Sequence, residues 1–209
     1  WGYVDVNPIA KAKPPENKDD NVTPRYLDAD EAKRLRAALD ARQQRQRDER
    51  RNANHWRRMR GYPEAPDLDA IPHTDRLKPL VLLALNTGCR RGELFNLQWD
   101  DADLAGGMLT VRGGGAKSGK TRHVPLNDEA RQVLTDWRVS TGATSGHVFP
   151  SEDGGRLDNI NKSWKGLMAA AQIERFRFHD LRHTFASWLV MRGVDLNTVR
   201  DLLGHADLK

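Results

Sequence analysis

The sequence predicts an α+β fold that is mostly helical and contains a small antiparallel β-sheet. Two strand-like runs, residues 108–112 (MLTVR) and 122–126 (RHVPL), flank a turn rich in glycine and lysine, which is typical of a β-hairpin. Before and after this hairpin, apolar residues recur at the three- to four-residue spacing of helices. With 209 residues, of which 38% are hydrophobic, the chain is large enough for one sizeable domain, or a domain and a tail.

The beginning of the chain predicts a linker followed by a helix. Residues 1–24 hold four of the ten prolines, with polar residues between them, which is typical of a flexible or extended linker. A helix then begins near Asp28 or Asp30, because either carboxylate can cap it. Four apolar residues at helical spacing mark its buried side: Ala32, Leu35, Ala38 and Leu39.

Residues 42–60 are strongly basic and allow two interpretations. They could form a stripe that contacts the DNA backbone. Equally, they could be a solvated extension of the preceding helix or a disordered loop, because arginine-rich runs are often only solvated surface. Residues 61–73 hold three prolines and predict a loop.

Helical spacing continues through the rest of the chain. A helix over 74–86 is apolar enough to be buried, and Thr87-Gly88 ends it. Gly193 and Gly204 end the last two predicted helices. The other helices are expected from Arg90 onward and over 128–139, 159–171, 179–191 and 196–203.

Composition narrows the classes of protein only slightly. Lys and Arg number 34 against 29 Asp and Glu, so the net charge of +5 is a weak indication of a nucleic-acid partner. The single cysteine, Cys89, allows no internal disulfide and fits a reducing cytoplasm. The longest apolar run, residues 79–85, is too short to span a membrane, so we expect a cytoplasmic protein with no membrane contact.

Two candidate site motifs lie around the hairpin. Arg90 and Glu93 share one face at a helix start, where a carboxylate can orient a guanidinium, although an ordinary surface ion pair has the same spacing. Lys117 lies in the turn, among glycines that allow a ligand to approach the backbone. Residues 114–121 match the letters of a nucleotide-binding P-loop, but a strand-like run follows them where a helix is required.

Two further motifs lie near the end of the chain. His179 and Arg182 project from the first turn of a helix, whose N-terminus favours anions, so the pair fits a phosphate. His179 could instead only cap the helix, or bind zinc together with His183. His205 follows the helix-ending Gly204, where a lone histidine is usually structural. Together the motifs are what a phosphoryl-transfer site without a metal needs: arginines for the phosphate oxygens and a lysine or histidine for the proton.

Four stretches in this order resemble the catalytic domain of the tyrosine recombinases, the phage-integrase family. Residues 87–94 (TGCRRGEL) are similar to the box with the family's first arginine, and 113–126 (GGGAKSGKTRHVPL) to the hairpin whose lysine enters the site. Residues 179–187 (HDLRHTFAS) match the His-x-x-Arg box, and 202–209 (LLGHADLK) resemble the box before the nucleophile. Residues 25–35 (RYLDADEAKRL) look like the usual opening of this domain.

The resemblance implies a three-stranded antiparallel sheet and a site that needs no metal or nucleotide cofactor. It assigns the scissile phosphate to Arg90 and Arg182, with Glu93 as the acidic partner. It assigns protonation of the departing 5′-oxygen to Lys117, with Lys120 as the nearby alternative. The remaining roles are proton transfer from the nucleophile for His179, a bond to a phosphate oxygen for His205, and DNA contacts for Lys120, Arg122, Arg91 and His183.

The resemblance also implies a nucleophile that no residue of this chain matches. The family's tyrosine lies beyond the position of His205, whereas Tyr3, Tyr26 and Tyr62 lie far upstream. We therefore expect residues 25–209 to be a catalytic domain that lacks its C-terminal end and forms no covalent link to DNA by itself. Residues 1–24 would be the linker from an absent DNA-binding domain, and a basic insertion would lie near 42–73.

The expected activity of the parent enzyme is site-specific recombination of double-stranded DNA through a 3′-phosphotyrosyl intermediate. The resemblance implies four protomers acting on two DNA partners, and a monomer for the isolated fragment. Two other functions remain open: a non-catalytic DNA-binding module with the same fold, and a zinc metallohydrolase that uses His179 and His183.

Overall fold

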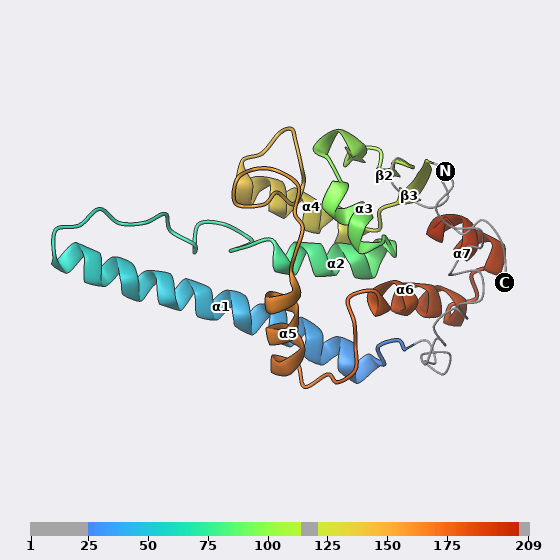
Figure 1. Ribbon diagram of the computed structural model, residues 1–209, viewed down its shortest axis with the longest axis horizontal. Helices are drawn as coiled ribbons and strands as arrows, with labels where there is room; N and C mark the ends of the chain where they lie inside the picture. The colour runs from blue at the N-terminus through green and yellow to red at the C-terminus, as the bar shows by residue number, and fades with distance from the viewer. Residues whose placement is uncertain (1–24, 114–120, 205–209) are drawn as a thin grey trace, which may run out of the picture.

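Helices supply most of the computed structural model, which describes residues 25–113 and 121–204 (Figure 1). The predicted linker over 1–24, Lys117, Lys120 and His205 lie outside the described residues. The mostly helical α+β class is confirmed. In chain order the elements are α1 (Ala29–Met59), α2 (Leu77–Thr87), α3 (Arg91–Asn96), the 3₁₀ turn η1 (Trp99–Asp101), β1 (Ala102–Asp103), β2 (Met108–Val111), β3 (Arg122–Pro125), α4 (Asp128–Thr141), α5 (Asn161–Ala170), α6 (Asp180–Met191) and α7 (Leu196–Leu203).

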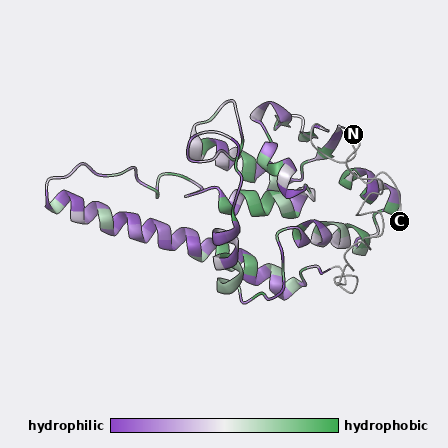
Figure 2. Cartoon of the chain, in the orientation of Figure 1, coloured by the Kyte–Doolittle hydropathy of each residue, from purple (hydrophilic) through white to green (hydrophobic). Residues whose placement is uncertain are grey.

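Helix α2 forms the centre of the core, as its apolar sequence predicts. It packs against both α4 and α6, and Leu80, Val81 and Leu83 are fully buried. Its apolar character stands out against the polar surface of α1 in Figure 2. Gly88 ends α2 in the left-handed conformation, and a Cβ there would lie 2.4 Å from the ring of Phe185 on α6. In the parts of the chain that the structure describes, no helix is both long and apolar enough to cross a membrane.

The sheet has three antiparallel strands in the order β1-β2-β3. Leu109 lies opposite Val124 in the β2–β3 pair, and both side chains are fully buried. Both hairpin strands were predicted from the sequence, and the third strand followed only from the family resemblance. That strand, β1, has two residues, so it is too short to carry a period-two pattern of its own.

The basic stretch after residue 41 is a helical extension of α1, which rules out the disordered loop, whereas the predicted contact with the DNA backbone stays a prediction. Asp28 caps α1 by accepting a hydrogen bond from the Glu31 backbone at 2.7 Å, and the helix runs without a break to Met59. The first part of α1 packs against α5, whereas residues 42–59, here called the α1 extension, project away from the body of the molecule (Figure 1). Residues 60–76, here called the return segment, run back along it.

Polar side chains fasten the return segment to the α1 extension. Arg47 donates to the carbonyl oxygens of Leu68 at 3.1 Å and of Ile71 at 2.9 Å. The buried Asn54 side chain exchanges two hydrogen bonds with the backbone of Ala65, at 2.8 and 2.9 Å. Several other side chains of the helix do the same: Gln43 bonds Pro72, Arg50 bonds Pro66, Arg57 bonds Pro63 and Arg58 pairs with Glu64. Backbone carbonyls and carboxylates thus share the charge that the sequence displays here.

Candidate functional site

Arg182 is the most deeply buried charge of the candidate site. It lies in the first turn of α6 with 4% of its surface exposed. Its two terminal nitrogens donate to the carbonyl oxygens of Gly88 at 2.8 Å and Leu203 at 2.5 Å. Burial, and then the nearby charge of Arg90, lower the pKa of Arg182 to about 10. Among the described residues no carboxylate pairs with it, so its charge is held only by neutral acceptors.

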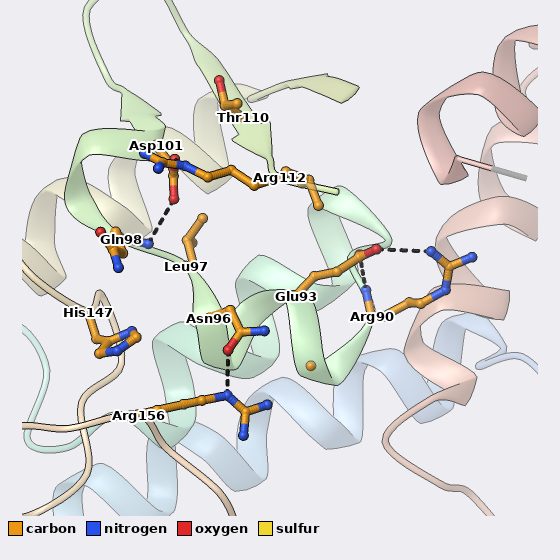
Figure 3. A pocket seen from close by; sticks show the side chains of 12 residues that line it. Arg90, Glu93, Asn96, Leu97, Gln98, Asp101, Thr110, Arg112, His147 and Arg156 are labelled. Atoms are coloured by element: carbon orange, nitrogen blue, oxygen red, sulfur yellow. Dashed lines mark hydrogen bonds and ion pairs between the residues drawn. The ribbon is translucent and has the colours of Figure 1, made fainter. Parts of the chain in front are cut away.

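Glu93 on α3 joins two other arginines and is itself buried. It accepts from the guanidinium of Arg90 at 2.9 Å and from the Arg90 backbone at 2.7 Å (Figure 3). Both terminal nitrogens of Arg122 also reach it, at 2.9 and 2.7 Å. Burial alone would raise the pKa of Glu93, but the hydrogen bonds from Arg122 and Arg90 lower it to about 2. Since its side chain is only 7% exposed, the arrangement differs from the ordinary surface ion pair that the spacing also allowed.

Arg122 connects this cluster to the end of α7. Its Nε donates to the carbonyl oxygen of Leu202 at 2.9 Å, next to the carbonyl of Leu203 that Arg182 holds. Gly204 follows at a φ of +66°, and a Cβ there would lie 2.9 Å from Arg122 Cδ. The two arginines therefore fix the turn that leads to residue 205.

The structure gives Arg122 a different environment from the one expected of a DNA contact. Its side chain is 10% exposed and faces Glu93. A signal for this lay in the sequence: Arg122 is two residues from the buried Val124, so the two share one face of β3. A direct contact between Arg122 and DNA stays a prediction.

His179 directly precedes α6, three residues before Arg182, and is partly exposed. Partial burial, then the charges of His183 and Arg182, lower its pKa, so the ring is neutral at neutral pH and can accept a proton. Its side chain makes no capping bond, and its ring lies 5.2 Å from that of His183. Within residues 25–113 and 121–204, no group of three or more His, Cys, Asp or Glu side chains could hold a metal ion, so nothing here favours the zinc alternative.

The fold thus gathers the predicted arginines, glutamate and histidine from separate elements. Arg90 and Glu93 come from the start of α3, and His179 and Arg182 from the start of α6. Arg90, Arg91 and His179 also line one open pocket of about 640 Å³. The carbonyl groups of Gly88 and Leu203 were missed, because a backbone acceptor leaves no side-chain signal in a sequence. The site can bind an anion with planar cations and can accept a proton beside it.

Solved structures with a similar fold are recombinases. XerA recombinase aligns with a TM-score of 0.64 and 28% identity over 88% of this chain and 57% of its own. XerH site-specific recombinase bound to difH substrate aligns with a TM-score of 0.62 and 22% identity, over 90% of this chain and 50% of its own. These likenesses place the fold in the class of recombinase catalytic domains, which the catalytic domain of bacteriophage HP1 integrase also represents, with a TM-score of 0.53.

The sequence comparisons then give the family. Residues 63–209 match the model of the phage integrase family, so the chain belongs to that family and the resemblance to tyrosine recombinases is confirmed. The integrase of Salmonella phage P22 is 31% identical over all of this chain and 47% of its own length. The tyrosine recombinase XerC of Xanthomonas campestris pv. campestris is 32% identical over 99% of this chain and 55% of its own. The chain spans about half the length of these curated relatives.

Proposed function

We propose that this chain forms the phosphate-binding part of a site-specific DNA recombinase, which cleaves and rejoins DNA strands through a 3′-phosphotyrosyl intermediate. The observation that carries the proposal is the buried Arg182, whose charge has only carbonyl acceptors while Arg90 lies near enough to lower its pKa. Arg90 and Arg122 share the single carboxylate of Glu93, and Arg182 has no carboxylate partner among the described residues. The cluster therefore has more positive than negative charge. A phosphodiester supplies the missing anion. Its transition state for cleavage carries more negative charge than the bound phosphodiester, so the arginines stabilise the transition state more strongly.

Each predicted residue has one role in this proposal. Arg90 and Arg182 bind the non-bridging oxygens of the scissile phosphate, and Glu93 fixes Arg90 in position. A tyrosine oxygen attacks phosphorus and forms a new P–O bond, while the bond to the 5′-oxygen breaks. His179 takes the tyrosine proton in its neutral form, and Lys117 gives a proton to the departing 5′-oxygen. His205 bonds a phosphate oxygen.

The proposed partner is double-stranded DNA, and the proposed working assembly is a tetramer on two DNA partners. A structural neighbour, the Tn1549 transposon integrase, was solved in complex with a circular intermediate DNA, which supports DNA as the ligand of this fold. The Arg91 and His183 side chains lie beside the phosphate-binding residues, and we propose both, with Lys120, as further DNA contacts. Cytoplasmic location and a single catalytic domain over residues 25–209 are part of the same proposal.

The proposal is tested by covalent trapping. The full-length protein that contains this chain is incubated with a nicked duplex that carries its recombination site, and protein–DNA adducts are separated on a denaturing gel. We expect an adduct that the Arg182→Ala variant forms far more slowly. If the full-length protein binds the duplex but never forms an adduct, the chain is instead a non-catalytic DNA-binding module of the same fold.

A further inference from the structure

A second pocket, distinct from the one beside His179, shares Arg90 and Gly92 with it. It has a volume of about 440 Å³, and α3, β2 and the segment between α4 and α5 form its walls. Arg90 and Glu93 lie at one end of the pocket and Arg156 and His147 at the other (Figure 3). Any strand of nucleic acid held at Arg90 therefore has this pocket as its neighbour.

The acidic groups of this pocket are already neutralised by its arginines. Asp101 pairs with Arg112 at 2.5 Å, and Glu93 pairs with Arg90 at 2.9 Å. Glu93 receives a second guanidinium from outside the pocket, that of Arg122. Because each carboxylate has at least one cation, any further cation in the pocket has no counter-charge there.

Arg156 is such a cation within this pocket, although it also borders a neighbouring pocket whose lining includes four carboxylates: Asp75, Glu152, Asp153 and Asp158. Its Nε donates to the side-chain oxygen of Asn96, a neutral acceptor (Figure 3). Within the described residues, no carboxylate lies within 4.0 Å of its guanidinium, and its two terminal nitrogens donate to no other group. Asn96 thus fixes one edge of the guanidinium and leaves the other edge open for a bidentate contact, which suits a phosphate.

We propose that Arg156 binds a backbone phosphate of the same DNA strand whose scissile phosphate Arg90 binds. This inference rests on the proposed function and adds a positioning residue to it. Arg90 caps the N-terminus of α3 and Asn96 is its last residue, so the short helix separates them by about 9 Å. A separation of this size allows the two arginines to contact phosphates that lie within a few nucleotides of each other on one strand. Arg156 therefore fixes the strand a few nucleotides from the scissile phosphate and carries no sequence preference.

The test compares two arginines of the same pocket. Arg156→Gln and Arg112→Gln remove the same charge from the chain, but Arg112 already has a carboxylate partner. Binding of each variant to a short duplex of arbitrary sequence is measured from about 50 to about 200 mM salt. For Arg156→Gln we expect binding weaker by about tenfold and a salt slope smaller by about one. For Arg112→Gln we expect a slope close to that of the original chain.

The outcomes separate this inference from the proposed function. If neither variant changes the salt slope while the affinity of the original chain falls steeply with salt, Arg156 makes no phosphate contact and the inference is wrong. If both variants change the slope equally, the change reflects net charge alone, and the inference is again wrong. If the original chain binds DNA with no salt dependence at all, the proposed function itself fails. Chemical unfolding of both variants confirms that each is folded, which is expected because Arg156 and Arg112 are both exposed.

Discussion

The arginines of the α1 extension and those around α3 and α6 differ in what accepts their hydrogen bonds and in how deeply they lie. In the extension, Arg47 reaches carbonyl oxygens of the return segment from a partly exposed position, and Arg58 pairs with Glu64 on the surface. At the site, the buried Arg182 donates to two carbonyl groups, and the buried Arg122 pairs with one carboxylate. In Figure 1 the extension projects at the left, whereas α3 and α6 lie in the body of the molecule.

This difference teaches that a count of arginines is a poor guide to anion binding. The extension looks like the most basic part of the sequence, yet much of its charge is used to hold the return segment. The site has fewer cations, but burial removes water from Arg182 and no carboxylate replaces it. A desolvated cation that has only neutral acceptors is stabilised most by the negative charge of an incoming phosphate.

The largest expected effect is on the site arginine. Arg182→Ala removes a cation that we propose binds the scissile phosphate, so single-turnover cleavage by the full-length protein should slow by about 10³-fold, which corresponds to about 4 kcal/mol. The readout is the rate of covalent adduct formation on a nicked duplex at saturating protein concentration.

The matched control for this variant lies at the other end of the same helix. Arg192→Ala removes an equal charge from an exposed residue after α6 and should leave the rate within about twofold, because screened surface charges act weakly. A folded Arg182→Ala protein that cleaves as fast as Arg192→Ala would contradict the assignment of the phosphate site.

The next effect concerns stability. Glu93→Gln removes the carboxylate that Arg90 and Arg122 share, and it leaves the Arg122 guanidinium buried with its charge unpaired. We expect the free energy of unfolding in urea to fall by about 3 kcal/mol. Glu49→Gln breaks an exposed pair with Arg45 and should change the free energy of unfolding by less than about 0.5 kcal/mol. Equal losses in the two variants would mean that the buried cluster contributes no more than a surface pair.

The same cluster predicts a dependence on acid. The pKa of Glu93 falls from 4.5 to about 2 on folding, so its contribution to stability is complete above pH 4.5 and is lost as the pH decreases toward 2. The lost contribution is about 3 kcal/mol for a shift of this size. Glutamine does not titrate, so the difference in unfolding free energy between the original chain and Glu93→Gln should shrink over this range. A difference that stays constant between pH 5 and pH 2 would exclude this linkage.

The sequence predicted most of the fold because its local signals agree with the tertiary structure. Helix α2 is mostly apolar and largely buried, and Gly88 stands where a left-handed residue ends it. The extension was ambiguous, because its helical form depends on contacts with a return segment that no local pattern reveals. Strand β1 was also beyond local reasoning, since two residues have no periodicity.

The residues of the site could be predicted from the sequence, but the contacts between them were harder to predict. Arg90, Glu93, His179 and Arg182 followed from spacing and from the family resemblance, and the structure brings them together. That Glu93 has a second arginine could not be read from the spacing, because Arg122 lies 29 residues away in the chain. Lys117, Lys120 and His205 fall outside the described residues, so their roles remain predictions.

The smallest expected effect is at the α1 extension, the region that the site arginines were compared with. Arg47→Ala removes the donors that hold the carbonyls of Leu68 and Ile71, and we expect the return segment to open more easily by about 1–2 kcal/mol. Hydrogen exchange of the backbone amides over residues 65–73 measures this local opening. Arg45→Ala, which loses only an exposed contact with Glu49 at 3.7 Å, is the control and should change it by less than about 0.5 kcal/mol. Cleavage should stay within about twofold in both variants, because screening limits the reach of surface charges; a larger loss in Arg47→Ala alone would make the extension part of the DNA-binding surface.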